Sequence, residues 1–231
     1  MKNEEMNTKE DILQKLRRGA KSLSGSVSSD GMSVNGDFPA GGFPMPDLSR
    51  LKPIVFADPV AEFKQKTTTT AGAQLIETTE GDDLNAVIRQ LALSSASAGH
   101  SPIIASNLPG VDAQLNPDTV SEAQQLSCTD IGVVRGTIGV AENACIWIPQ
   151  TMKERAVCFA SERLVIVLSA DNIVSNMHEA YDRIEAMPEN FRDYKFGTFI
   201  SGPSKTADIE GALVYGAQAA RSVTVVLVNR K

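Results

Sequence analysis

The chain has 231 residues, of which 42% are apolar and 22% are charged. A chain of this length and composition can bury roughly 70 to 75% of its unfolded surface in one compact domain, which excludes an intrinsically disordered protein. Its net charge of −6 at pH 7 offers little counter-charge to phosphate backbones, so we expect no nucleic-acid partner.

The cysteine content points to a reducing compartment. The three cysteines, Cys128, Cys145 and Cys158, include no C-x-x-C pair and no even set, so the chain alone predicts neither a disulfide framework nor an iron–sulfur or zinc site. The charged start MKNEEMNTKED predicts no signal peptide, and no apolar run approaches the roughly 18 residues of a membrane span. We therefore expect a cytoplasmic protein without a spanning helix.

The first fifty residues differ from the rest in composition. Thr8 can cap a short helix in which Ile12, Leu13 and Leu16 form an apolar stripe, although the same segment also fits a frayed terminus. Between Gly19 and Asp47, 15 of 29 residues are Gly, Ser or Pro, which is typical of a flexible linker. We predict an N-terminal helix and linker over residues 1–50 and one domain over residues 51–231.

Strands and helices alternate at the start of that domain. PIVFADP (53–59) predicts a strand that leads into a helix, and AGAQLIET (71–78) predicts the next strand. Asp82 or Asp83 then caps a helix with apolar residues at i, i+3, i+4 and i+7. PIIAS (102–106) predicts a further strand. The pair Asn116-Pro117 predicts the start of a helix.

The second half of the chain predicts a mixed sheet. The apolar runs IGVV, TIGV, CIWI, AVCFA and LVIVL follow one another between Ile131 and Leu168. The joints between them are too short for crossover helices, so we expect hairpins. Asp171 or Asn172 opens a helix that ends at Pro188, and GTFIS leads through a turn into a last helix before the final strand VTVVLV. The fold class is α/β with a mixed sheet.

The segment SGPSKTADIE (201–210) is the first candidate site. A strand that hands over to a helix here would leave backbone N–H groups unpaired at the helix start, where they can bind a carboxylate or phosphate. The residues that favour this function are Ser201, Gly202 for close backbone approach, Ser204 and Thr206 for their hydroxyls, and Lys205 for its charge. Asp208 favours the alternative, in which its own carboxylate caps an ordinary helix.

The segment TIGVAENACIWI (137–148) is the second candidate site. It places Glu142 and Asn143 on a tight turn between two apolar strands. In a cleft, Glu142 would suit acid–base or nucleophilic chemistry, and the Asn143 amide would suit oxyanion stabilisation. The alternative is a hairpin turn whose polar residues only meet solvent.

Other chemistry-bearing residues predict no site. His100 and His178 have no third ligand at metal spacing, so we expect no metal centre. Cys145 and Cys158 lie in apolar runs and are interpreted as core thiols, and Trp147 is expected to pack in the core.

Together the two segments resemble the LutC/YkgG family, the single LUD-domain proteins of lactate utilization. The pattern I-S-G-P-S-x-T-A-D-I-E of that family is filled in order from Ile200 to Glu210. Its earlier pattern, A-E-[TS]-G-[TS]-L, is met by Ala141 and Glu142 only. The resemblance extends from Thr8 to Lys231.

The resemblance implies a three-layer α/β fold of the kind shared by NagB, RpiA and coenzyme A transferases. It implies a subunit of a cytoplasmic system that oxidises L-lactate to pyruvate together with iron–sulfur partner proteins, while this chain ligates no cluster and its own cofactor is unknown. Two positions depart from the family. Gln218 replaces the usual histidine of G-x-H-G-P, and Asn143-Ala144 replaces a Thr-Gly or Ser-Gly pair. These departures favour a divergent substrate or a subunit that binds without catalysis.

The predicted site therefore joins both segments at one pocket. Glu142 is the catalytic candidate. The residues expected to bind a small carboxylate or phosphate are Asn143, Ser201, Gly202, Ser204, Lys205, Thr206 and Asp208. Two alternatives remain open: a coenzyme A transferase-like enzyme that uses Glu142 as its nucleophile, because Glu142-Asn143-Ala144 is similar to that family's E-N-G, and a non-catalytic ligand-binding or scaffold protein.

Overall fold

The computed structural model describes residues 52–95, 101–187, 196–209 and 212–231. The chain divides into a unit of residues 1–52 and a unit of residues 53–231, and the structure below is that of the second unit. The predicted N-terminal helix and linker, His100 and Pro188 lie outside the described residues. Within the described residues, no helix is both long and apolar enough to cross a membrane.

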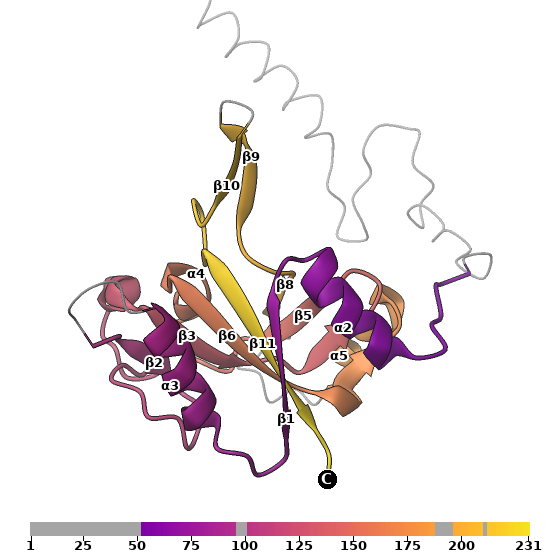
Figure 1. Cartoon of the computed structure of the whole chain (residues 1–231), viewed down its shortest axis with the longest axis horizontal. Helices are drawn as coiled ribbons and strands as arrows, with labels where there is room; N and C mark the ends of the chain where they lie inside the picture. The colour runs from indigo at the N-terminus through magenta and orange to yellow at the C-terminus, as the bar shows by residue number, and fades with distance from the viewer. Residues whose placement is uncertain (1–51, 96–100, 188–195, 210–211) are drawn as a thin grey trace, which may run out of the picture. The chain divides into compact units, whose positions relative to one another are not determined.

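A parallel sheet of five strands forms the centre of the second unit (Figure 1). Its strand order is β1 (Gln74–Thr79), β11 (Ser222–Asn229), β6 (Arg163–Ser169), β3 (Ile131–Arg135) and β2 (Ile104–Ser106). The three middle strands carry runs of buried apolar residues because both faces of the sheet are covered.

Helix α3 (Leu84–Ser95) covers one face of this sheet. Its Ile88 and Leu91 pack against the valines and isoleucines of β3, β6 and β11 that point to that face. Asp83 caps the helix start, since its Oδ1 accepts a hydrogen bond from the Asn85 N–H at 2.9 Å. The helix predicted after Asp82 or Asp83 is confirmed.

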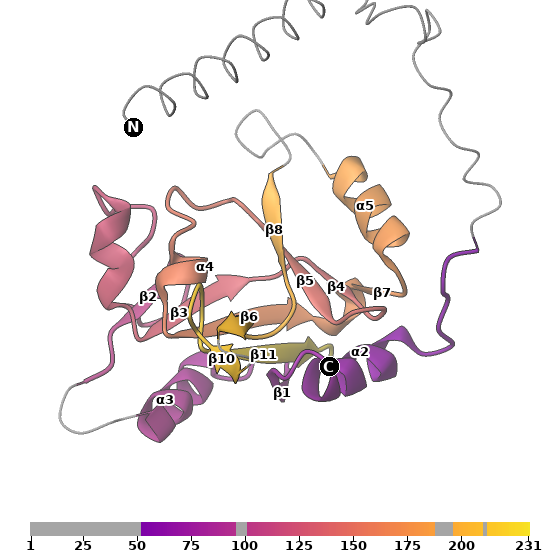
Figure 2. The same ribbon diagram turned by 90° about the horizontal axis from the view of Figure 1, so that it is seen from above.

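Helix α2 (Pro59–Thr69) and a second sheet cover the other face (Figure 2). The second sheet has the order β7 (Ile173–Val174), β4 (Ile138–Val140), β5 (Cys145–Pro149) and β8 (Gly197–Ile200). Its β7–β4 pair is parallel and its other pairs are antiparallel. Helix α5 (Met177–Ala186) packs on its outer face, where the rings of Trp147 and Phe199 contact each other at a tilt, with centroids 4.8 Å apart.

The α/β fold class is confirmed, and the structure shows where the mixed pairing occurs. The central sheet is wholly parallel, and the mixed sheet is the second one. Of the hairpins predicted between Ile131 and Leu168, β4–β5 forms, whereas β3 and β6 pair in parallel. The turn at Gly136 carries the chain out of the first sheet, because the strand that follows it, β4, belongs to the second.

A two-stranded antiparallel hairpin replaces the helix predicted after the SGPSKT turn. Its strands are β9 (Lys205–Ile209) and β10 (Ala212–Tyr215), and Figure 1 shows it standing away from the two larger sheets. The sequence contains the reason, since Gly211 separates two short runs and the second ends in the strand-favouring Val214 and Tyr215. The predicted helix is wrong.

Four shorter predictions are also corrected. Residues 53–58 form no strand and lead directly into α2, which Asp58 caps by accepting from the Ala61 N–H. AVCFA forms the short helix α4 (Val157–Ala160), because a short buried apolar run does not distinguish a strand from a helical turn. After Asn116 there is a single turn, and the 3-10 helix η2 (Ala123–Cys128) follows.

The fourth correction concerns α5. This helix begins at Met177, and Asn176 is its cap. Asp171 and Asn172 belong instead to a 3-10 turn, η3 (Ala170–Asn172), which precedes β7. A capping side chain decides this boundary, since the Asn176 Oδ1 accepts from the Glu179 N–H at 3.0 Å.

The cysteines differ in exposure and in acidity. Cys145 of β5 and Cys158 of α4 are buried, and desolvation raises the pKa of each thiol to about 12. Cys128 is exposed at the end of η2. The interpretation of Cys145 and Cys158 as core thiols is confirmed.

Removing a side chain between the two sheets should destabilise the domain strongly. Ile166 of β6 is fully buried in the cluster that also holds Ile146 and Ile148 of β5. We expect Ile166→Ala to lower the free energy of unfolding by about 2 to 5 kcal/mol in urea titrations. The control Leu93→Ala, at a side chain that is 79% exposed on α3, should cost less than about 0.5 kcal/mol. Equal losses would contradict the packing of the two sheets against each other.

Thiol reactivity should separate the three cysteines. At pH 8 in the folded protein, a disulfide reagent should modify Cys128 rapidly and leave Cys145 and Cys158 unmodified. The two thiols are inaccessible because they are buried, and their raised pKa values keep them protonated. Spectrophotometric titration measures this result. Cys128→Ser should abolish the fast phase, and denaturant should release all remaining thiols; a fast phase that survives the substitution would contradict the burial of the other two.

Candidate functional site

The two predicted segments meet at the starts of β1 and β11. The Ser201 hydroxyl donates a hydrogen bond to the backbone oxygen of Asn143 at 2.8 Å, which joins the corner after β8 to the β4–β5 turn. Three residues further on, the corner packs beside the segment that enters β11, since the Ser204 N–H donates to the Ala220 oxygen at 3.0 Å. We call this meeting of Glu142, Asn143, Ser201, Gly202 and Lys205 the motif junction.

Gly202 and Lys205 tie the motif junction to the end of α2. Gly202 has a φ of +70°, and a Cβ there would collide with the backbone oxygen of Ala71, so glycine is required. The Lys205 ammonium donates to the Ala71 oxygen at 2.6 Å and to the Thr70 oxygen at 3.4 Å. A cation at these otherwise free carbonyls stabilises the helix end.

Glu142 has a comparable role at the start of α5. Its Oε2 accepts a hydrogen bond from the N–H of Met177, the first residue of that helix, at 3.0 Å. Its backbone oxygen accepts from the Lys66 ammonium at 3.1 Å, and Lys66 is itself paired with Glu62 at 3.0 Å. The carboxylate is half-buried and lies at the positive end of a helix dipole.

The β4–β5 turn keeps a glycine-like backbone without a glycine. Ala144 has a φ of +56°, which is rare for a residue with a Cβ. It stands where the resemblance implies glycine. The Asn143 side chain supports the turn, because its Oδ1 accepts from the Cys145 N–H at 3.1 Å. Asn143 itself is exposed.

The remaining predicted residues do not surround a helix start. Lys205–Ile209 is a strand, so the free N–H groups expected of a helix N-terminus are not formed there, and the predicted mode of anion binding is wrong. Ser204 and Thr206 are half-buried. Asp208 lies in β9, but the structure does not describe its side chain. Gln218 is exposed in the segment between β10 and β11, beside a second cavity that Cys128 also lines.

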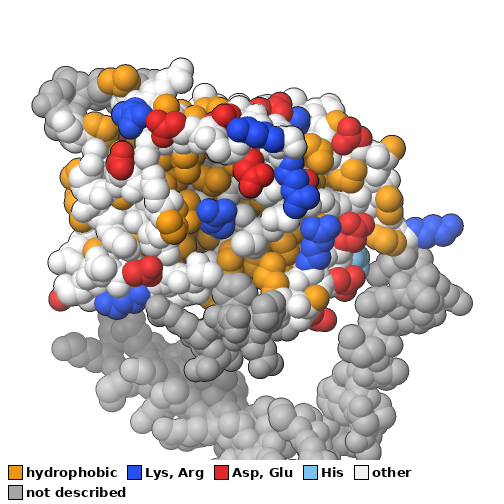
Figure 3. All heavy atoms as spheres, turned by 90° about the horizontal axis from the view of Figure 1, so that it is seen from below, with side chains coloured by type: hydrophobic (Ala, Val, Ile, Leu, Met, Phe, Trp, Pro, Cys, Tyr) orange, Lys and Arg blue, Asp and Glu red, His pale blue; other side chains and the backbone are white. Residues whose placement is uncertain are grey.

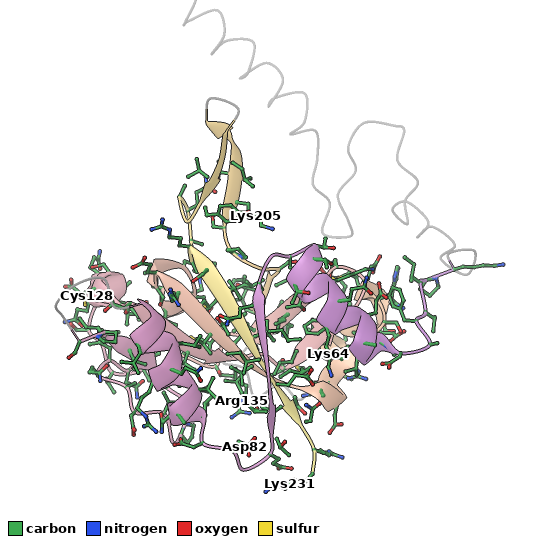
Figure 4. The ribbon with its side chains drawn as sticks, viewed as in Figure 1. Lys64, Asp82, Cys128, Arg135, Lys205 and Lys231 are labelled. Atoms are coloured by element: carbon green, nitrogen blue, oxygen red, sulfur yellow. The ribbon has the colours of Figure 1, made fainter. Side chains whose placement is uncertain are left out.

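Sequence reasoning missed a cleft at the opposite end of the parallel sheet. Its volume is about 420 Å³, and it lies where β1, β11, β6 and β3 end. Its lining includes Thr79, Gly81, Asp82, Arg135, Ser169 and Asn229. We call it the carboxyl-edge cleft. Figure 4 labels Asp82, Arg135 and Lys231 at this end of the sheet. The sequence signal was present, because Arg135 directly follows the apolar run IGVV.

Some charged side chains of the carboxyl-edge cleft have a partner within the protein and others have none among the described residues. Arg230 pairs with Asp171 at 2.5 Å, and Asp82 accepts from the Thr79 N–H at 2.7 Å. Arg135 is exposed, and its guanidinium has no ion pair or hydrogen bond to the described residues. Figure 3 views this end of the sheet and shows side chains of both charges interspersed with hydrophobic surface. Glu80 is the remaining acid of the lining.

Metal-ligating side chains are scattered. In the part of the chain that the structure describes, no group of three or more His, Cys, Asp and Glu residues could hold a metal ion. His178 is exposed on α5.

Comparisons with known proteins agree with this fold. The LUD domain family matches residues 60–228, which include the motif junction and Arg135. "Lactate utilization protein C" of Shouchella clausii is 27% identical over 124 residues, which cover 53% of this chain and 54% of the relative, so the chain spans about half the length of the curated relative it matches. A DUF162 family protein of Deinococcus radiodurans matches in structure with a TM-score of 0.54 and 16% identity, over 76% of this chain and 99% of that chain, and it supports the fold alone. Because the family covers well over half of its residues, this chain belongs to the LUD domain family.

Proposed function

We propose that this chain is a LutC-like subunit of a cytoplasmic lactate-utilization system, which oxidises L-lactate to pyruvate with iron–sulfur partner proteins. The observation that carries the proposal is the LUD domain match over residues 60–228, together with a relative named for lactate utilization. In this proposal the clusters belong to the partners. The three cysteines of the sequence, two of them buried, are consistent with that arrangement.

The β9–β10 hairpin is the proposed contact with such a partner. Within the described residues its strands pair only with each other, and a two-stranded ribbon gains little stability alone. It exposes Leu213 and Tyr215, whose side chains are 55% and 46% accessible. The motif junction holds its base against α2 through Gly202 and Lys205. A ribbon with a fixed base and apolar side chains is suited to contact another protein.

The geometry of Glu142 favours a structural role over acyl transfer. The Glu142 carboxylate is held at the start of α5 by the hydrogen bond that its Oε2 accepts from the Met177 N–H, which is a structural contact. The Asn143 amide oxygen is likewise used inside its own turn. The non-catalytic alternative is therefore preferred to the coenzyme A transferase-like one at this position.

Partner capture tests the proposed function and the hairpin separately. The tagged chain, co-expressed with the iron–sulfur lactate-utilization proteins of its own organism, should retain at least one of them. The double variant Leu213→Thr with Tyr215→Thr, which keeps strand-favouring residues, should reduce retention at least about tenfold. The control Leu93→Thr, at a still more exposed leucine, should not.

The outcomes of that experiment differ in meaning. No retention by the unmodified chain, together with normal growth on lactate after gene deletion, would refute the proposed function. Retention that is equal in the hairpin variant and the control would refute the hairpin contact alone.

Substitution of Glu142 should change stability and leave no trace of acyl chemistry. Glu142→Ala leaves the Asn176 cap in place but removes the acceptor of the Met177 N–H at the start of α5, and should lower the free energy of unfolding by about 1 to 2 kcal/mol. Glu142→Gln keeps an acceptor oxygen and loses the charge at the helix start, so its cost should be about 0.3 to 1 kcal/mol. Urea denaturation measures both. In parallel, incubation with acetyl-CoA should give no mass adduct, and an adduct on Glu142 would contradict the structural role.

A further inference from the structure

We propose that the carboxyl-edge cleft binds a small 2-hydroxycarboxylate, with the Arg135 guanidinium holding its carboxylate and an acidic side chain accepting its hydroxyl. This inference deepens the proposed function and rests on it only for the choice of lactate as the ligand to test. The cleft is a different place from the motif junction, which lies at the other ends of the strands.

The loops that leave the carboxyl ends of the central strands account for the cleft. The loop after β1 leads to α3 on one face, whereas the segment after β6 passes through η3 to β7 on the other face. Loops that diverge to opposite faces leave a crevice at the carboxyl ends of parallel strands, which is where open α/β sheets bind ligands. Residues from both loops line the cleft, Gly81 and Asp82 from the first and Asp171 and Asn172 from the second.

Size and lining suit a small polar molecule. The volume of about 420 Å³ falls within the range of ligand pockets. Val167 and Val228, near the ends of β6 and β11, contribute apolar residues to the lining of the cleft, and Thr79 and Ser169 contribute hydroxyl-bearing ones. A short hydroxy acid has one apolar carbon end and one polar end, and this lining offers both kinds of contact.

Arg135 determines the sign of the ligand. It is the last residue of β3, opposite Val167 of β6, and it shares a strand face with Ile131 and Val133. The other cation of the lining, Arg230, is neutralised by Asp171. A guanidinium without an acid of its own binds a carboxylate through two parallel hydrogen bonds.

The acids of the cleft determine which second functional group the ligand carries. Glu80 and Asp82 line the same cleft and can only accept hydrogen bonds when ionised. They therefore favour a ligand that donates, such as the hydroxyl of lactate, over the keto oxygen of pyruvate. They also repel a compact dianion, so inorganic phosphate should bind worse than a monocarboxylate despite its higher charge.

The experiment measures binding to the purified full chain by isothermal titration calorimetry. L-lactate, pyruvate and inorganic phosphate are the probes. We expect lactate to bind more tightly than either of the other two, and Arg135→Gln to weaken lactate binding at least about tenfold. Arg135→Lys should recover only part of the loss, because an ammonium cannot make the two-pronged contact. The control Arg221→Gln removes an exposed arginine at the opposite end of the sheet and should leave the dissociation constant unchanged.

A second variant keeps the test decisive if Arg135→Gln fails to fold. Glu80→Gln leaves Arg135 in place and should reduce the preference for lactate over pyruvate at least about threefold, because the amide can donate to a keto oxygen. Lactate binding that is unaffected by Arg135→Gln, or phosphate binding as tight as lactate binding, would overturn the proposal.

Failure of this inference is distinguishable from failure of the proposed function. In one outcome, the chain retains its iron–sulfur partner but binds no lactate at 50 mM, which is roughly ten times the largest dissociation constant expected of such a site. This outcome overturns the cleft assignment alone. A chain that binds lactate through Arg135 but retains no partner overturns the subunit role and leaves the cleft.

Discussion

Burial of the central sheet on both faces is the constraint from which the rest of the structure follows. The strands β6 and β11 carry buried apolar side chains in both directions, so each face needs its own cover. Helix α3 supplies one cover, and α2 with the inner face of the second sheet supplies the other. Because both faces of this sheet are covered, ligands can reach its described strands at their ends. The position of each candidate site is a consequence of this arrangement.

The two ends of the sheet have different chemistry. At the amino end, the polar groups of the motif junction satisfy one another: Lys205 binds the carbonyls that end α2, Glu142 binds the N–H that begins α5, and Ser201 joins the two turns. At the carboxyl end, Arg135 has no such partner among the described residues. Satisfied polar groups stabilise a fold, whereas an unsatisfied cation beside a cavity is available to a ligand. We therefore propose structural roles for the residues that identify the family.

Sequence patterns predicted the elements that one local signal determines. The long β-branched runs of β6 and β11 and the regular apolar spacing of α3 were recognised because burial requires those patterns. AVCFA and KTADI were misassigned because a run of five residues fits a strand and a helical turn equally well. The sequence offers one sign of the carboxyl-edge cleft, the arginine that follows IGVV, but the cleft itself could not be predicted. Its lining residues, from Thr78 to Arg230, come together only through the strand order, which no local pattern encodes.

Ala144 shows how the fold tolerates its departures from the family pattern. A positive φ at alanine costs about 1 kcal/mol relative to glycine, yet the turn keeps this conformation. The turn is fixed from outside, by the Ser201 hydroxyl on the Asn143 oxygen, by the Lys66 ammonium on the Glu142 oxygen and by the Glu142 carboxylate on α5. These contacts are made by Glu142 and Asn143, the two residues before Ala144, and do not require a glycine at position 144. A lost glycine at this position therefore leaves the motif junction intact, and the departure gives no reason to expect a changed ligand, since the cleft that we assign to the ligand lies at the other end of the sheet.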